Sequence, residues 1–196
     1  MSLRHAILGF LSLRPLTGYD LKRYFDNSIR HFWSADQAGI YRALNDLSDE
    51  GLVTHERVAQ QTRPDRKVYH ATPAGLAALD AWLAAPAPAV VRREPLLIKL
   101  FFAKRLAPEA LRQLLEEELA SVEAELENFR GIVASIRAEP NTSDESELLG
   151  PLITLTNGVR TAAAQRDWLR ALLGMQEAGA LTAGALFEEL AEQLQR

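Results

Sequence analysis

The chain has 196 residues, a formal net charge of −4 and no cysteine. The lack of cysteine excludes a disulfide framework, a thiolate zinc site and a cysteine nucleophile. Apolar residues make up 47% of the chain and charged residues 24%, as in ordinary globular proteins, and no apolar run is as long as a membrane span. Because the N-terminus also lacks the pattern of a signal peptide, we expect a cytoplasmic protein that contacts no membrane.

Charge is distributed unevenly along the chain. Residues 1–85 carry 10 Lys and Arg against 9 Asp and Glu, whereas residues 86–196 carry 12 against 17. A nearly neutral first part and an acidic second part indicate two different tasks. The segment Ala84-Ala85-Pro86-Ala87-Pro88 is typical of a break between them, so we predict one domain over residues 1–85 and another over residues 86–196.

The first two predicted helices are separated by a proline. The first ends at Arg14-Pro15, because proline disfavours a helical backbone at the residue before it. Its apolar side chains at helical spacing are Leu3, Ile7, Phe10 and Leu11. Thr17 and Asp20 are typical of a capping box and predict the start of the second helix. Its apolar face consists of Leu21, Tyr24 and Phe25, and we expect fraying over residues 27–30.

A third helix and a hairpin follow. Ser34 and Gln37 form an S-x-x-Q capping box, and Gly51 stops the helix. Its predicted buried stripe is Ile40, Ala43, Leu44 and Leu47. Two short β-prone runs then flank the polar residues 60–67, which predicts a two-stranded hairpin with a basic tip. A fourth helix begins at Thr72-Pro73 and carries Leu76, Leu79, Trp82 and Leu83.

The second half is helical throughout. Residues 96–102 are apolar almost all round, which predicts a short buried helix. From Pro108, spacings of four and three form a coiled-coil seam of Leu115, Leu119, Val122, Leu126, Phe129, Val133 and Ile136. After a polar break at residues 140–147, a second seam, interrupted by Arg166, consists of Leu148, Leu152, Leu155, Val159, Ala162, Leu169 and Leu173. A last amphipathic helix carries Leu186, Phe187, Leu190 and Leu194.

Three helices followed by a two-stranded wing is the order of a winged helix-turn-helix, whose third helix enters the major groove of DNA. We therefore predict a mainly α-helical protein with an N-terminal winged helix-turn-helix and a C-terminal antiparallel, coiled-coil-like dimerisation domain. The predicted DNA-binding residues are Ser34, Gln37, Ala38, Tyr41, Arg42 and Asn45 at the third helix, and Arg63, Arg66 and Lys67 on the wing. An arginine side chain can donate two hydrogen bonds to guanine, and Asn or Gln can form a hydrogen-bonded pair with adenine. The cations of the wing can bind the phosphate groups of the DNA backbone.

Several motifs resemble the PadR family of transcriptional regulators. They are residues 3–11, residues 16–21, Gly39-Ile40-Tyr41-Arg42-Ala43-Leu44 with Leu47 and Gly51-Leu52-Val53, and Arg66-Lys67-Val68-Tyr69 with Thr72 and Gly75. Residues 94–96 and 99–102 are similar to the longer subgroup with a large C-terminal dimerisation domain. The resemblance implies a dimeric, usually repressing, DNA-binding protein that a ligand or partner releases. Asp36 departs from the pattern, because many members have neutral residues before the third helix.

DNA-binding proteins of this type generally bind two half-sites about one helical turn apart, which requires a two-fold dimer. We therefore predict that the protein binds double-stranded DNA as a homodimer. The predicted interface residues are Leu119, Val122, Leu126, Phe129, Leu152, Leu155, Val159 and Leu169. A monomeric antiparallel helix pair, which buries the same stripes within one chain, is the alternative.

Arg166 needs a partner wherever it is buried, and a ligand carboxylate is one candidate. Phe101, Phe102 and Trp168 could supply aromatic walls, which makes a small aromatic effector a further predicted partner. In the other interpretation, these aromatic residues belong to the core and Arg166 pairs with a nearby Glu or extends into solvent.

No cofactor, metal or catalytic activity is expected. The four histidines, at positions 5, 31, 55 and 70, show no metal-ligand spacing, and the chain has neither a Gly-rich phosphate loop nor a G-x-S-x-G motif. Besides DNA binding, one other function stays open: a helical interaction module whose winged domain binds a protein partner.

Overall fold

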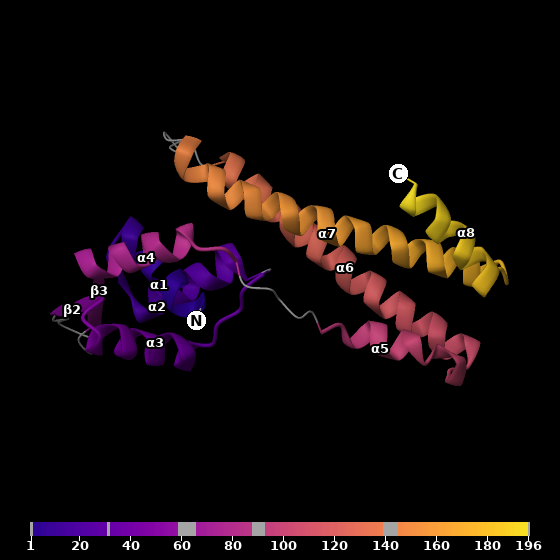
Figure 1. The fold of residues 1–196 in the computed structure, drawn as a ribbon, viewed down its shortest axis with the longest axis horizontal. Helices are drawn as coiled ribbons and strands as arrows, with labels where there is room; N and C mark the ends of the chain where they lie inside the picture. Colours follow the sequence, from indigo (N-terminus) through magenta and orange to yellow (C-terminus); the bar gives the residue numbers. More distant parts are fainter. Residues whose placement is uncertain (1, 31, 59–65, 88–92, 139–144, 196) are drawn as a thin grey trace. The chain divides into compact units, whose positions relative to one another are not determined.

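Helices account for most of the chain in the computed structural model, which describes residues 2–30, 32–58, 66–87, 93–138 and 145–195. Figure 1 shows the elements in chain order, and they divide into two compact units, Met1–Val90 and Val91–Arg196. The first unit holds every strand in the described part of the chain, whereas the second is built from helices alone.

The first unit follows the order of a winged helix-turn-helix. Its helices are α1 (Ser2–Leu13), α2 (Gly18–Tyr24), α3 (Gln37–Asp49) and α4 (Pro73–Ala84). Its strands are β1 (Leu16–Thr17), β2 (Val53–Val58) and β3 (Arg66–Ala71). The capping box predicted at the start of α2 is confirmed, because the Asp20 amide donates to the Thr17 hydroxyl and the Thr17 amide donates to the Asp20 carboxylate. Gly51, with φ of 72°, ends α3 in the left-handed region as expected.

The predicted two-stranded hairpin is confirmed as β2 and β3, and a short third strand, β1, adds to the sheet. β3 lies in the middle, with β2 and β1 antiparallel on either side of it. Leu16 is opposite Tyr69, and Thr17 is opposite Val68. The sequence did not predict β1, because two residues carry no alternation of their own and are extended only through pairing with the distant strand β3.

The core of the first unit lies between the four helices and the inner face of the sheet. The predicted stripe of α3 is confirmed, since Ile40, Ala43, Leu44 and Leu47 are all buried. They pack with α1, α2 and the sheet through Ile7, Leu21, Phe25, Val53 and Tyr69. The polar side of α3 is therefore left to face solvent.

The second helix does not fray where we expected. The chain continues after α2 as the π-helical segment η1 (Phe25–Ile29), in which Phe25 is fully buried. Phe10 contacts the Phe25 ring edge-on, with ring centroids 5.2 Å apart. Because burial of such a ring stabilises the fold by about 2–3 kcal/mol, packing holds this segment helical despite its polar residues.

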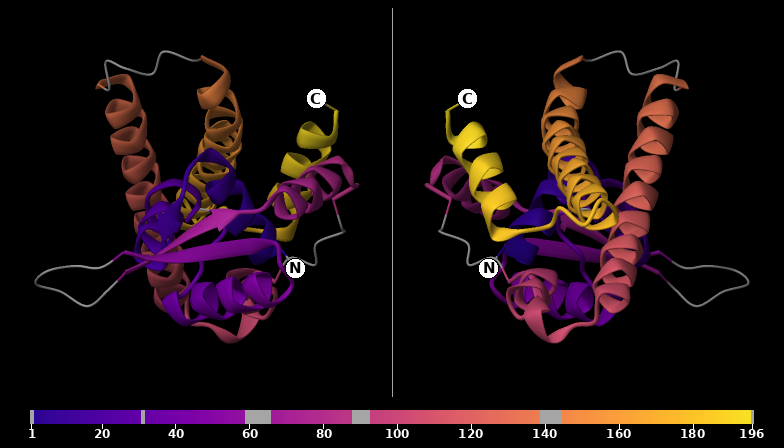
Figure 2. Two further views of the ribbon diagram at one scale, coloured as in Figure 1. Left: turned by 90° about the vertical axis from the view of Figure 1, so that its left-hand side faces the viewer. Right: turned by 90° about the vertical axis from the view of Figure 1, so that its right-hand side faces the viewer.

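The second unit is dominated by two long antiparallel helices, which Figures 1 and 2 show as one hairpin. Its elements are α5 (Pro95–Phe101), the 3-10 turn η2 (Ala103–Arg105), α6 (Pro108–Ala138), α7 (Glu145–Glu177) and α8 (Ala183–Leu194). Arg112 pairs with Glu177 at 3.0 Å, and Gln165 donates to Glu118 at 3.1 Å, so polar contacts flank the apolar seam. In Figure 2 the two helices diverge towards the C-terminal end of α6 and the N-terminal end of α7.

The prediction that residues 96–102 form a buried helix is wrong in one respect. α5 forms, but none of its residues is buried, and Phe101 is 82% exposed. Only Leu96 and Leu100 pack against the core of the second unit. A helix that is apolar all round needs neighbours on every side, and one chain supplies a neighbour on one side only.

Candidate nucleic-acid interface

Helix α3 is capped by Asp36, not by the predicted Ser34 box. The Gly39 amide donates to the Asp36 carboxylate at 2.7 Å, and Asp36 is the N-cap residue. The box prediction is wrong because Asp36 is at least as good a cap as serine and lies one residue before the first helical residue, Gln37. Ser34 therefore precedes the helix and is exposed. Asp36, which departs from the PadR pattern, therefore has a structural role, because its carboxylate accepts a hydrogen bond from the otherwise unpaired Gly39 amide.

The exposed stripe of α3 carries the side chains that we predicted for base reading. Gln37, Ala38, Tyr41, Arg42 and Asn45 are all exposed, on the side of the helix opposite its buried stripe. Arg42 has no ion-pair partner among the described residues, so its guanidinium is free to bind another molecule. A helix with an apolar inner face and donors and acceptors on its outer face can enter a groove without unfolding.

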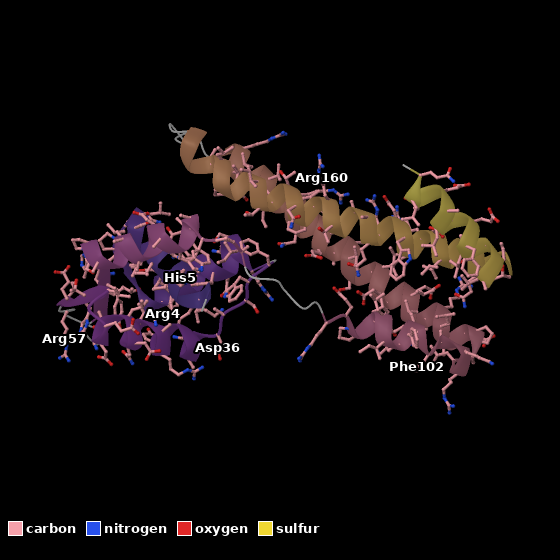
Figure 3. The ribbon with its side chains drawn as sticks, in the orientation of Figure 1. Arg4, His5, Asp36, Arg57, Phe102 and Arg160 are labelled. Carbon is pink, nitrogen blue, oxygen red and sulfur yellow. The ribbon has the colours of Figure 1, made fainter. Side chains whose placement is uncertain are left out.

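The wing carries its positive charge on paired strands. Arg57 on β2 is opposite Lys67 on β3, and Val58 is opposite Arg66. Arg66 and Lys67 therefore lie in the strand rather than in the hairpin tip, and all three cations are exposed. Arg63 lies outside the described residues. Figure 3 labels Arg57, which our sequence reasoning missed because its role depends on the strand register.

A hollow of about 500 Å³ lies where α2, α3 and β3 meet. Its lining residues are Thr17, Gly18, Tyr19, Asp20, Tyr41, Arg66, Lys67 and Tyr69. Tyr19 is 66% exposed and Tyr41 is 39% exposed, so two phenol groups and two cations share one surface. The carboxylate of Asp20 accepts from the Thr17 hydroxyl at 2.7 Å and is engaged in the helix cap.

Gly18 lies against Tyr41 in this hollow, which Tyr69 also lines. A Cβ at position 18 would lie 2.6 Å from Cε1 of Tyr41, so the ring lies directly against the glycine backbone. Burial, and in smaller part the nearby Tyr41, raises the pKa of Tyr69 above its ordinary value of 10, which keeps this phenol protonated at neutral pH. Tyr19 was missed as a site residue, because its place beside Tyr41 depends on the packing of α2 against α3.

The four residues predicted for an effector do not line one cavity. Arg166 lines a cavity between α6 and α7, while Phe102, which Figure 3 labels, lines another near α5. Trp168 packs against the core of the second unit, and Phe101 contacts Phe102 edge-on with ring centroids 5.1 Å apart. Arg166 pairs with the neighbouring Asp167 at 2.7 Å. This agrees with the interpretation in which Arg166 pairs with a nearby acidic residue, although the partner is an aspartate rather than a glutamate.

The residues predicted for a dimer interface contribute mostly to the core of their own chain. Val122, Leu126, Phe129, Leu155 and Leu169 are buried within the second unit. Leu119 and Val159 are half-buried, and Leu152 is 40% exposed. Packing of α6 against α7 in one chain thus uses most of both seams and leaves other apolar faces uncovered.

Within the described parts of the chain, no group of three or more His, Cys, Asp or Glu side chains is placed to hold a metal ion. No described helix is both long enough and apolar enough to span a bilayer.

Comparison with known proteins identifies both halves of the chain. Residues 7–81 match the model of the transcriptional regulator PadR-like family, and residues 92–176 match the virulence activator alpha C-terminal model. The negative transcriptional regulator PadR of Bacillus subtilis is 31% identical over 176 residues, which cover 88% of this chain and 96% of that relative.

Two solved structures are similar over nearly their whole length. Bacillus subtilis PadR in complex with operator DNA has a TM-score of 0.79 and 29% identity, covering 90% of this chain and 99% of that one. The same protein in complex with p-coumaric acid has a TM-score of 0.75 and 28% identity, with coverages of 90% and 99%.

Proposed function

The chain belongs to the PadR-like family of transcriptional regulators, and from this premise we propose that it binds a pseudo-palindromic operator as a homodimer. Like the other members of this family, it is a DNA-binding regulator and not an enzyme. In the proposal, α3 enters the major groove and the wing lies along the phosphate backbone. Its site of action is the cytoplasm, where chromosomal DNA is accessible to it.

One observation carries the base-reading part of the proposal. The outer face of α3 is polar and uncovered, although the helix is otherwise fully packed. Arg42 can donate two hydrogen bonds to guanine, and Asn45 or Gln37 can pair with adenine. Ala38 is small enough to contact a thymine methyl group, and Ser34 lies just before the helix, beside the end that reads bases.

The hollow and the wing supply phosphate contacts. Lys67, Arg66 and Arg57 provide charge, and the hydroxyl groups of Tyr19 and Tyr41 provide donors at the same surface. Contacts of this kind fix the position of a protein on the duplex but carry no sequence information. We therefore propose a division of labour, in which α3 selects the sequence and the wing with the hollow supplies affinity.

Two substitutions test this division. Arg42→Ala should cost about 1–3 kcal/mol on the correct operator and much less on unrelated DNA, so base preference relaxes. Lys67→Ala should weaken binding on all sequences about equally. Arg160→Ala, on an exposed arginine of α7 that Figure 3 labels, removes the same charge away from the site and is the control. Equal behaviour of the Arg42 and Lys67 variants would contradict the division.

Salt dependence separates DNA from a protein partner of the winged unit. For DNA, the logarithm of the binding constant should fall linearly with the logarithm of salt, with a slope of about −0.9 for each phosphate contacted. Lys67→Ala should reduce the slope by about 1. A binding constant that hardly changes with salt would favour the protein-interaction alternative.

Dimer formation is supported by the apolar side chains that one chain leaves uncovered in the second unit. They include Leu97, Ile98, Phe101, Leu149, Ile153 and Phe187, each at least 50% exposed. Where such side chains form contiguous patches, they mark surfaces that another protein covers. Sedimentation at micromolar concentration should give twice the chain mass of 21.8 kDa, and a monomer mass would refute the dimer.

Repression is the regulatory outcome that we propose, because the relative with 31% identity is a negative regulator. The C-terminal match to a virulence activator model makes activation the specific alternative. A reporter gene behind the selected operator decides between them: loss of the protein should raise expression under repression and lower it under activation.

Release by a small aromatic acid is the second part of the proposal, since B. subtilis PadR binds p-coumaric acid. Phe102 lines a cavity of about 490 Å³ together with Lys99 and Arg105, so one wall can stack on a ring and two cations can pair with a carboxylate. Arg166 and Trp168 do not line this cavity.

Titration with p-coumaric acid should raise the melting temperature of the protein and release the operator. Phe102→Ala should weaken both effects about tenfold or more, whereas Phe101→Ala, which removes a ring outside the cavity lining, should weaken them less. Unchanged melting temperature and operator binding in the wild-type protein would count against this effector.

A further inference from the structure

A second cavity of the helical unit lies between α6 and α7, where the two helices diverge in Figure 2. Its volume is about 520 Å³, which is within the range of small-molecule sites. Along α6 its lining runs from Leu126 to Arg137, about 16 Å at the rise of an α-helix, so the cavity is an elongated groove. Among the described residues it shares no lining side chain with the cavity beside Phe102. The groove is therefore a separate candidate site.

Apolar side chains from both helices form the walls of this groove. Leu126 and Phe129 belong to the lining but are already buried by the core of their own chain. The other apolar lining residues are half-buried or exposed: Val133, Ala134, Val159 and Ala163. A slender apolar molecule that lies along these side chains removes its own surface and theirs from water, which favours binding.

Three arginines supply the charged part of the lining. Arg130 and Arg137 come from α6 and Arg166 from α7, and no acid lines the groove in the part of the chain that the structure describes. Arg130 pairs with Glu127 and Arg166 with Asp167, and neither acid belongs to the lining. Arg137 has no ion-pair partner among the described residues. The groove therefore attracts anions, although acids outnumber cations in this half of the chain.

We propose that this groove binds the anion of a straight-chain fatty acid, with its carboxylate on Arg137 and its alkyl chain along the apolar walls. The carboxylate goes to Arg137 because the other two arginines of the lining already hold an acid. A guanidinium group can donate two parallel hydrogen bonds to a carboxylate. The inference goes beyond the proposed function, since the ligand differs in class from the aromatic acid at Phe102 and its binding requires no DNA.

Shape and charge together favour this ligand over three others. An inorganic anion would pair with the arginines but would leave the apolar walls in water. An aromatic acid is short and broad, whereas the groove extends about 16 Å along α6. A long-chain amine would fill the groove but would bring a like charge to the arginines.

Calorimetric titration of the full chain with decanoate tests the site. Decanoate should bind once per chain, whereas decylamine, which has the same chain length and the opposite charge, should not bind. Acetate keeps the carboxylate without the long chain and should bind at least about 100-fold more weakly than decanoate. No binding of decanoate, or equal binding of decanoate and decylamine, would overturn the proposal.

Two substitutions locate the ligand. Arg137→Gln removes the charge of an exposed side chain and should weaken decanoate binding about tenfold or more. Ala134→Leu fills part of the groove from an exposed position and should weaken binding by about the same factor. Arg160→Gln and Ala164→Leu make the same changes at exposed positions of α7 outside the lining, and they should bind decanoate normally. Circular dichroism verifies helix content, and normal decanoate binding by both groove variants would overturn the assignment.

The same measurements separate this inference from the proposed function. Phe102→Ala should leave decanoate binding unchanged, and Arg137→Gln should leave release of the operator by p-coumaric acid unchanged. Loss of decanoate binding in Phe102→Ala would assign the fatty acid to the other cavity and overturn the groove. A chain that binds the operator but not decanoate refutes only the groove, and one that binds decanoate but no operator refutes only the proposed function.

Discussion

Helices α3 and α8 both expose one face, but the two faces differ in chemistry. On α3 every large apolar side chain of the inner stripe is buried, and the outer face carries Arg42 and Asn45. On α8 three apolar side chains are exposed, including Phe187 at 71%. A polar face can stay in water until DNA arrives, whereas an apolar face favours a permanent protein partner.

This difference extends to the units that hold the two helices. The first unit buries Phe25 and Leu44 completely with residues of its own. The second unit buries Phe129 and Leu169 in the α6–α7 seam but leaves α5 and α8 largely uncovered. We infer that the first unit folds without a partner and that the stability of the second unit depends on a second copy.

Two matched core substitutions should have the largest effects and separate the units. Phe25→Ala and Phe129→Ala each remove a fully buried ring and should cost about 3–5 kcal/mol of unfolding free energy. Phe25→Ala should abolish operator binding while the dimer persists, and Phe129→Ala should dissociate the dimer. Denaturant unfolding and sedimentation measure the two effects. Leu13→Ala, at a 75% exposed position, should change stability by no more than about 0.5 kcal/mol.

The comparison breaks if the two phenylalanine variants behave alike. Loss of the dimer in Phe25→Ala would mean that the first unit contributes to assembly. An unfolding midpoint of the second unit that does not rise with protein concentration would mean that it needs no second copy.

The next largest effect concerns the tyrosine hollow of the first unit. Gly18→Ala places a Cβ against the Tyr41 ring and should displace it, at a cost of about 1–3 kcal/mol divided between stability and operator binding. Gly9→Ala, on α1, meets no atom within 4 Å and should leave operator binding unchanged. Electrophoretic mobility shifts and thermal melts measure both. Normal operator affinity in Gly18→Ala would remove Tyr41 from the proposed contacts.

Signals contained in a short stretch of sequence predicted much of the first unit. The stripe of α3, the stop at Gly51 and the Thr17 cap each depend on residues within about one or two helical turns. Strand β1 and the position of Arg57 depend on pairing across the sheet, and Tyr19 depends on how α2 packs against α3. Such long-range contacts leave no periodic pattern in a single sequence.

The second unit shows a different limit of sequence reasoning. Heptad spacing predicted the seams of α6 and α7, and their side chains do form one core. The same spacing fits packing within a chain or between chains, so it could not say which partner covers the seam. Residues 96–102 are almost all apolar, which predicted a buried helix. Such a pattern shows that the side chains are apolar but not whether another part of the protein covers them.

The corrected start of α3 leads to a smaller effect. Asp36→Ala removes the carboxylate that accepts from the Gly39 amide and should cost about 1 kcal/mol of stability. Ser34→Ala, which changes an exposed residue before the helix, should cost almost nothing. Thermal unfolding of the two variants distinguishes the caps. The reverse order of the two effects would restore the Ser34 box that the sequence suggested.

The smallest expected effect concerns the ion pair that joins α1 to the end of α3. Both Nη atoms of Arg4 donate to the Glu50 carboxylate, and this hydrogen bonding lowers the pKa of Glu50 below its ordinary value of 4.5. A carboxyl whose pKa is lowered by folding stabilises the native state above its unfolded pKa. That contribution is lost as the pH falls through the lowered folded pKa.

Arg4→Ala should therefore lower the melting temperature of the first unit at pH 7, by less than Asp36→Ala does because the pair is exposed. The difference from wild type should disappear below the folded pKa of Glu50, where the carboxyl is protonated in both proteins. Thermal melts from pH 7 to pH 3 measure this convergence. A constant difference across that range would mean that Arg4 acts through packing of its side chain on α1 rather than through charge. In that case the end of α3 would be held, like its middle, by contacts that do not titrate.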